Sequence, residues 1–203
     1  RGNIAPSGLM SLVMLLSLVP AMGVTASAAD DTSYASDSIR NYETLAAYLE
    51  SGDSRDLTLE NDIDYTMGYD DDYLRVRNNQ KLDLNGHKIR IDATKRAEFF
   101  NLITITSGEF TLYDSKGGGA IEVEFARDYK RHSIIEISPA SNGAPAKFTM
   151  NGGTLTRLNP LDSNVYGNNG CISDDYFNPF EGGERPQITI NGGTINCRTH
   201  ALW

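Results

Sequence analysis

The sequence predicts an all-β protein: a right-handed parallel β-helix of about four to five coils, each with three short strands, and a short N-terminal capping α-helix. The first observation is an internal echo, because "KFTMNGGTL" at 147–155 returns as "QITINGGTI" at 187–195. A hairpin would explain one Asn-Gly turn between apolar residues, but it would not explain the second copy. The echo therefore indicates that similar units are stacked.

The second observation is that the echo belongs to a series of five units, each opening with two apolar residues around one other residue. The unit starts are spaced 25, 28, 38 and 40 residues apart, so a constant core carries loops of variable length. Two further short strands fit inside each complete unit, and stacking them about 4.8 Å apart gives a β-helix. A β-sandwich also has short strands, but it does not predict a repeated three-strand unit. The units start at Leu57, Leu82, Phe110, Phe148 and Ile188.

Residues 1–28 are typical of a secretory signal peptide. An apolar run from Leu9 to Val19 precedes Pro20, and the small-residue sequence Ala26-Ser27-Ala28 follows as a cleavage site. The run is too short to cross a bilayer, which takes about 20 apolar residues. The sequence therefore predicts a secreted protein with no membrane span after cleavage.

A polar linker at 29–40 precedes a predicted capping helix at 41–52. Asn41 is a suitable N-cap, Leu45, Tyr48 and Leu49 form one apolar stripe, and Gly52 is a suitable stop. The stripe needs a surface to cover, and the segment that follows, 53–203, has strand character throughout. We therefore expect the helix to cover the N-terminal end of the β-helix.

The composition bounds the class of partner. The 203 residues are enough for one domain, and a formal net charge of -9 disfavours nucleic acid, whose phosphates attract basic proteins.

Cys171 and Cys197 lack the spacing of a metal or redox motif. Because side chains along a strand alternate between the inside and the outside of the coil, Cys197 is predicted to point inward and Cys171 outward, which disfavours a disulfide. Arg157 falls on an inward position, so either a bulge brings Leu158 inward or the register is wrong there.

The corner motifs, together with the leader and the helix, resemble the right-handed parallel β-helix proteins of the pectate-lyase-like superfamily. "LDLNGHKI", "GEFTLYDSKGGGAIEV" and "FTMNGGTL" are similar to repeat regions of Gram-positive secreted or surface proteins. The resemblance covers about residues 41–203. It is specific for the fold and a weak guide to activity, because many functions share this scaffold.

In each coil, the corner after the first strand is short and resembles the tight turn with an asparagine stack in pectate lyases. Asn provides an amide that can bond along the stack, and Gly permits positive φ. Matching this corner makes the third strand of each coil the cleft-forming face. The corner residues are Asn85, Asn151, Asn191, Gly86, Gly152 and Gly192.

The outward positions of the third strands are predicted to be Arg75, Thr104, Glu136 and Ser173. A glycoside hydrolase needs two acids at a defined separation, and only Glu136 and Asp174 are candidates. A calcium-dependent lyase needs several converging carboxylates, which this column lacks. No cofactor or metal is predicted. Calcium binding by the acidic run at 70–72 has no supporting motif, and a solvated charge run explains it.

The long loops beside the third strands carry candidate ligand-binding residues. Aromatic rings next to carboxylates and amides suit sugars, whose apolar faces stack while their hydroxyls form hydrogen bonds. The alternative is that the aromatic residues pin a long loop to the coil. His132, in a basic stretch, is expected to be solvated. The candidates are Tyr176, Phe177, Phe180, Asp175, Arg127 and Arg131.

The sequence favours a non-enzymatic, exported β-helix segment of a bacterial cell-surface protein. It would serve as an adhesive or spacer module, with an extracellular glycan or a host or cell-wall surface as partner. The alternative is a polysaccharide lyase or glycoside hydrolase that acts on an extracellular glycan. Because Ala201, Leu202 and Trp203 would begin the third strand of a fifth coil, we expect the β-helix to be truncated there and further domains to follow.

Overall fold

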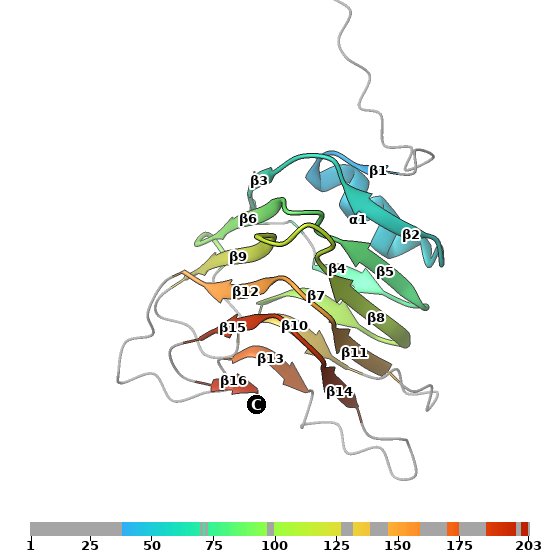
Figure 1. Cartoon of the computed structure of the whole chain (residues 1–203). Coiled ribbons are helices and arrows are strands. Elements are labelled where there is room, and N and C mark those ends of the chain that lie inside the picture. Colours follow the sequence, from blue (N-terminus) through green and yellow to red (C-terminus); the bar gives the residue numbers. More distant parts are fainter. Residues whose placement is uncertain are drawn as a thin grey trace, which may run out of the picture. The chain divides into compact units, whose positions relative to one another are not determined.

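The computed structural model describes residues 38–69, 71, 73–96, 100–126, 132–138, 146–158, 170–174, 186–197 and 200–202. These residues form three stacked parallel sheets and one helix (Figure 1). Each of five coils contributes one strand to each sheet, which confirms the predicted parallel β-helix. None of the helices in the described residues is long and apolar enough to span a membrane. The predicted signal peptide lies outside the described residues.

The strands of each sheet follow one another in coil order, and all neighbours pair in parallel. Sheet A contains β1 (Ser38–Ile39), β2 (Asp56–Leu59), β5 (Gln80–Asp83), β8 (Gly108–Tyr113), β11 (Ala146–Met150) and β14 (Gln187–Ile190). Sheet B contains β3 (Ile63–Thr66), β6 (Lys88–Ala93), β9 (Ala120–Phe125), β12 (Thr154–Arg157) and β15 (Thr194–Asn196). Sheet C contains β4 (Leu74–Val76), β7 (Phe100–Ile105), β10 (His132–Ile137), β13 (Gly170–Asp174) and β16 (His200–Leu202).

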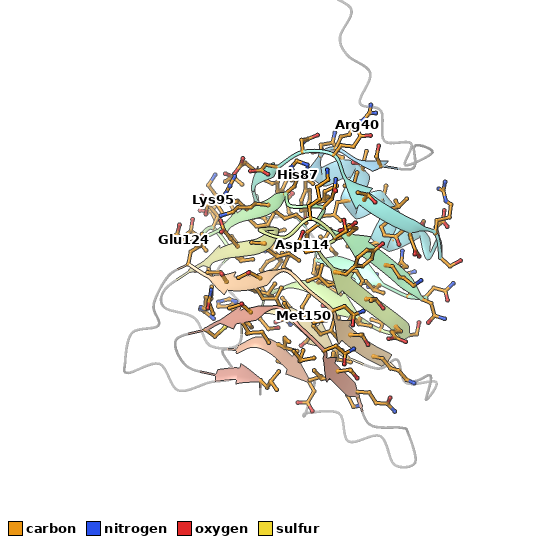
Figure 2. The ribbon with its side chains drawn as sticks, in the orientation of Figure 1. Arg40, His87, Lys95, Asp114, Glu124 and Met150 are labelled. Carbon is orange, nitrogen blue, oxygen red and sulfur yellow. A yellow bond between two sulfur atoms is a disulfide. The ribbon has the colours of Figure 1, made fainter. Side chains whose placement is uncertain are left out.

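The core lies between the three sheets, where inward side chains of successive coils stack. Phe110 and Phe148, one coil apart, are stacked with their ring centroids 6.0 Å apart. Met150 is also fully buried, whereas Arg40 and Lys95 project from the outside of the stack (Figure 2). Continuous burial of apolar side chains is the main stabilising contribution to such a fold.

The helix α1 (Tyr42–Ser51) is capped at both ends as predicted. The Thr44 amide donates to Asn41 Oδ1 (2.9 Å) and the Asn41 amide donates to Thr44 Oγ1 (3.2 Å). Gly52 ends the helix with φ of 69°, a left-handed conformation that glycine adopts without strain. Leu45, Tyr48 and Leu49 are fully buried, so the predicted apolar stripe covers the first coil.

The polar linker predicted at 29–40 is wrong at its end, because Ser38 and Ile39 form β1. This short strand pairs with β2, with Ser38 opposite Thr58 and Ile39 opposite Leu59. Ile39 is fully buried. One apolar residue in a polar stretch is a weak signal, but its burial and the free edge of β2 together explain the extra strand.

The stacking of sheet A differs from the predicted unit starts at one step. Leu82 lies opposite Leu112, not opposite Phe110, and Gln80 takes the position opposite Phe110. Gln80 is fully buried, and its Nε2 donates to the carbonyl oxygen of Tyr48 near the end of α1 (2.6 Å). The Tyr48 carbonyl, in the last turn of the helix, also accepts from the Ser51 hydroxyl (2.7 Å). The buried amide of Gln80 thus finds a partner at a position that holds an apolar residue in the later coils.

Cys171 and Cys197 form a disulfide, so the prediction of two free thiols is wrong. Cys171 is fully buried, and it precedes the buried residue Ile172. Two successive buried residues also occur one coil earlier, at Ile134 and Ile135. Strict alternation therefore fails in the middle of sheet C, and this irregularity lets Cys171 reach Cys197.

Arg157 occupies the inward position that its register predicts. It pairs with Val123 and is 6% exposed, whereas Leu158 is 50% exposed. Both expected alternatives are therefore wrong, because no bulge exchanges the two residues and the register is the predicted one. The fifth coil also follows the prediction, since β16 pairs in parallel with β13.

Candidate functional site

The outward face of sheet C carries the column of polar residues that the sequence predicts. Arg75 lies opposite Thr104, Thr104 opposite Glu136, and Glu136 opposite Ser173. Their neighbours Ile103, Ile105, Ile135 and Ile137 are buried in the core. The column therefore runs along the stack with one residue from each of the first four coils.

Two residues that the sequence analysis missed extend this column sideways. Asn101 Oδ1 accepts hydrogen bonds from the amide (3.0 Å) and the hydroxyl (2.7 Å) of Ser133. The hydroxyl of Ser173 bonds that of Ser133 (2.9 Å), which joins the two sets of residues. The signal is present in the sequence, because Asn101 and Thr104 flank one apolar pair and Ser133 and Glu136 flank another. We call Arg75, Asn101, Thr104, Ser133, Glu136 and Ser173 the sheet C strip.

The sheet C strip is poorly exposed although its residues are polar. Thr104 and Ser173 are each 5% exposed and Ser133 is fully buried. Thr104 donates to Glu136 Oε2 (3.3 Å). Buried polar groups are costly unless they are hydrogen-bonded, and here hydroxyls, an amide and a carboxylate satisfy one another. Hydroxyls and amides can donate to and accept from a hydroxyl-rich ligand, and the carboxylate can accept from it.

The register does not bring Glu136 and Asp174, the candidate acids, into one column. Glu136 lies opposite Ser173, whereas Asp174 lies opposite Ile137, whose side chain is fully buried in the core. Neighbouring positions on a strand point to opposite faces of the sheet. Within the described residues, the sheet C strip thus holds a single carboxylate, Glu136.

No group of three or more His, Cys, Asp or Glu residues that could hold a metal ion occurs among the described residues. Asp71 is engaged locally, because its Oδ2 accepts from the hydroxyl of Tyr65 (3.1 Å) and from the Gly68 amide. Asp70 and Asp72 lie outside the described residues, so the acidic run is described only at Asp71. The candidate ligand-binding residues Tyr176, Phe177, Phe180, Asp175, Arg127 and Arg131 also lie outside the described residues.

His132 is buried, so the expectation that it is solvated is wrong. It is 1% exposed and its ring stacks on Phe125, with centroids 5.2 Å apart. The pKa of His132 is lowered to about 4, chiefly by burial; its backbone hydrogen bond with Phe100 acts to raise the pKa and the positive charge of Arg157 acts to lower it. His132 is therefore neutral at physiological pH.

The short corner after sheet A contains part of the predicted asparagine stack. Asn191 Nδ2 donates to Asn151 Oδ1 (2.8 Å), one coil away. Asn85 is not part of this stack. Asp83 pairs with Tyr113, and continuing the register places Tyr113 opposite Asn151, so Asn85 lies two positions further along the corner. Positive φ occurs at Gly86 as expected, but Gly152 and Gly192 do not adopt it. In their coils it falls on the next glycines, Gly153 and Gly193.

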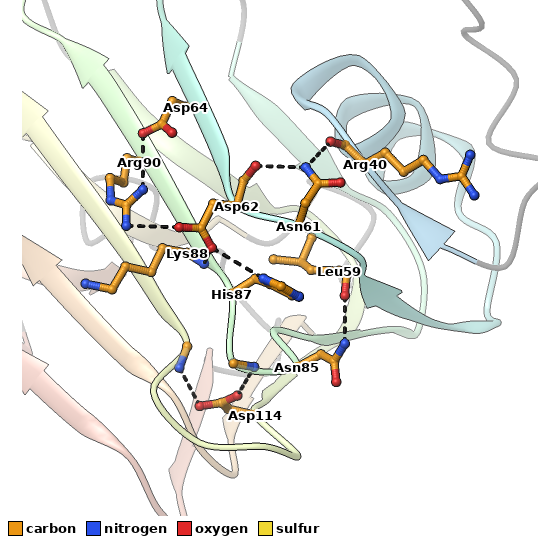
Figure 3. Close-up of polar contacts among 12 residues, drawn as sticks. Arg40, Leu59, Asn61, Asp62, Asp64, Asn85, His87, Lys88, Arg90 and Asp114 are labelled. Carbon is orange, nitrogen blue, oxygen red and sulfur yellow. Dashed lines mark hydrogen bonds and ion pairs between the residues drawn. The ribbon is translucent and has the colours of Figure 1, made fainter.

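In the first three coils, carboxylates hold the corners together with asparagine amides such as that of Asn85, whose Nδ2 donates to the carbonyl oxygen of Leu59 (2.9 Å; Figure 3). Asp114 accepts from the amides of Gly86 and Gly119, each at 2.7 Å, and so ties two coils together. Asp62 accepts from the Lys88 amide (3.0 Å) and pairs with Arg90 (3.1 Å). The Lys88 amide, followed by Arg90, lowers the pKa of Asp62. These contacts are explained by coil stacking.

No family model matches the chain, and neither a curated protein nor a solved structure matches it. The geometry alone therefore defines the class, which is that of all-β parallel β-helix proteins with a capping helix.

Proposed function

We propose that the chain is an exported, non-enzymatic β-helix segment of a bacterial cell-surface protein that serves as an adhesive or spacer module. We further propose that the outward face of sheet C binds an extracellular glycan. The observation that carries this proposal is the sheet C strip, in which poorly exposed hydroxyl, amide and carboxylate groups run along the stack.

The spacing of the strip suits a linear polymer. Parallel strands lie about 4.8 Å apart, and the half-buried members of the strip, Arg75, Asn101 and Glu136, come from three successive coils, so a chain lying along the stack meets one after another. Glycans present hydroxyls at similar intervals, and these can pair with the Asn101 amide, which donates and accepts, and with the Glu136 carboxylate, which accepts. Because the partners are already hydrogen-bonded to one another, little side-chain ordering is needed on binding.

Two further observations support export and a binding role. The disulfide between Cys171 and Cys197 is typical of an oxidising compartment, in agreement with the predicted leader. Glu136 is the one carboxylate of the sheet C strip, and acid-pair hydrolysis requires two. The register thus supports binding better than hydrolysis.

Glycan binding is tested with the purified full chain and a panel of soluble xylan, mannan, mixed-linkage β-glucan and polygalacturonate. We expect at least one polymer to retard the protein in affinity electrophoresis. Thr104→Lys and Glu136→Ala should weaken that retardation, and Thr149→Lys, on the outward face of sheet A, is the matched control. Equal retardation of all variants, or no binding to any polymer, would contradict the proposal.

Enzymatic activity is tested on the same polymers with the unmodified protein. We expect no release of reducing ends or unsaturated products. Depolymerisation that is lost in Glu136→Gln would contradict the non-enzymatic role and favour a lyase or hydrolase.

A further inference from the structure

A cavity of about 350 Å³ lies between α1 and the first strand of sheet C. One wall is a single stripe of α1, formed by Tyr42, Ala46 and Glu50, which are spaced four residues apart. The opposite wall is formed by the first coil. The residues from that coil are Asp71, Tyr73, Leu74 and Arg75. The volume of this cavity is at the lower end of the range for small-molecule sites.

The cavity continues the sheet C strip. Arg75 lines the cavity and is also the first member of the outward column, opposite Thr104. Since β4 is the edge strand of sheet C and α1 packs against it, the helix lies where a coil before the first one would be. A polymer lying along the strip therefore meets the wall formed by α1 and cannot continue in that direction.

The lining has the chemistry of a site for one sugar residue. The guanidinium of Arg75 lies 4.7 Å from the centre of the Tyr73 ring, and its Nη2 donates to the Tyr73 hydroxyl (2.6 Å). This contact holds a cation and an aromatic ring in fixed positions at one wall. Glu50 contacts Arg77 (3.7 Å) and Asp71 accepts from Tyr65 and Gly68, but each carboxylate has further acceptor sites for sugar hydroxyls. A cation, an aromatic side chain and carboxylate acceptors thus line the cavity.

We propose that this cavity binds the terminal residue of the glycan, so that the protein recognises chain ends rather than internal segments. This inference rests on the proposed function, because it names the part of the glycan that the sheet C face selects. End recognition follows from the position of α1, which closes the strip at the first coil. A site open at both ends would bind internal segments equally well.

Filling the cavity from the helix tests this inference. Ala46 lines the cavity and Ala47 does not, although both are half-buried residues of α1. Ala46→Trp should weaken binding of the hexasaccharide of each polymer that the full chain binds by about tenfold or more, while Ala47→Trp stays within about twofold. Glu50→Trp and its exposed helix control Glu43→Trp provide a second pair if the Ala46 variant fails to fold.

Recognition of chain ends is also tested on the unmodified protein, by letting polymers and oligosaccharides compete for binding at equal mass. Xylan, mannan, mixed-linkage β-glucan and polygalacturonate are each compared with their own hexasaccharides, which contain many more ends. We expect the hexasaccharide to compete about tenfold better or more. Equal competition by mass, or wild-type binding by both Ala46→Trp and Glu50→Trp, would overturn end recognition but leave glycan binding intact. If the unmodified chain binds no polymer or hexasaccharide, both proposals fail.

Discussion

The guanidinium of Arg157 lies 4.8 Å from the centre of the Phe125 ring, inside the solenoid. Its Nη1 donates to the carbonyl oxygen of His132 (3.3 Å). Among the described residues, no carboxylate forms an ion pair with it. Burial lowers the pKa of Arg157 to about 10, still well above neutrality. A cation is thus held in the core by an aromatic face and a carbonyl.

Replacing this buried cation should stabilise the protein. Arg157→Met keeps a long side chain over Phe125 and removes the cost of desolvating a charge, so we expect the free energy of unfolding to rise by about 1 to 2 kcal/mol. Urea denaturation monitored by circular dichroism measures the change. Arg90→Met, on the outside of sheet B, is the control and should not stabilise. A loss of stability in Arg157→Met would show that the contacts with Phe125 and His132 outweigh desolvation.

His132 should make the protein less stable as the pH falls from 6.5 to 4. Its folded-state pKa is about 4, below the value of about 6.5 in an unfolded chain. In this interval the unfolded chain takes up a proton that the folded protein excludes, which costs up to about 3 kcal/mol of stability. His132→Phe keeps a ring on Phe125 and should remove that part of the acid-side loss.

The pH effect is measured as the difference between the variant and the unmodified protein, because carboxylates also titrate in this range. Urea denaturation at pH 7, 6, 5 and 4 gives the two curves. Gln187→Asn, at an exposed position of sheet A that carries no titrating group, should keep the curve of the unmodified protein. Parallel curves for His132→Phe and the unmodified protein would rule out His132 as the titrating group.

The disulfide should contribute substantially to stability. It links residues 26 apart in sequence, and in the chain-entropy account closing such a loop is worth about 3 to 4 kcal/mol. The double variant Cys171→Ala with Cys197→Ala should lose about this much free energy of unfolding. The unmodified protein in dithiothreitol should match it, and dithiothreitol should leave the double variant unchanged. Equal stability with and without reductant would contradict this assignment.

Asp114 should be the most sensitive residue of the corners. Asp114→Ala removes the acceptor of the Gly86 and Gly119 amides, and we expect a loss of about 2 to 4 kcal/mol in the free energy of unfolding. Asp114→Asn retains one acceptor oxygen and should lose about half as much. Thermal and urea unfolding measure both. Similar stability of all three proteins would indicate that the glycine amides find other acceptors.

Features that depend on local chemistry were predictable from the sequence. The capping helix was predicted because Asn41 and Gly52 bracket one apolar stripe, and capping depends on residues close in sequence. The outward position of Glu136 was predicted because apolar residues flank it directly on both sides, Ile135 and Ile137, and both face the core.

Alternation also gave Arg157 an inward position, but the expectation that a bulge or another register would remove the charge from the core was wrong. The Phe125 ring and the His132 carbonyl that accept the charge come from the preceding coil and cannot be read from the strand itself.

Features that depend on neighbouring coils were not predictable. Gln80 appears polar and exposed in the sequence, but the carbonyl of Tyr48 in α1 provides its partner. Asn101 and Ser133 were missed for a different reason: the apolar pairs that follow them are visible in the sequence, but strict alternation does not allow for such pairs. The same interruption of the alternation turns Cys171 toward Cys197.

The sequence by itself determined that this chain stacks short parallel strands into coils, that a capped helix precedes them, and which residues face outward where alternation is regular. Only the tertiary structure decided the register between the second and third coils, the disulfide, the burial of His132 and the cavity under α1. The physical reason is that periodicity specifies which face of a strand is apolar, whereas stacking chooses among registers that differ by two residues and keep the same face inside.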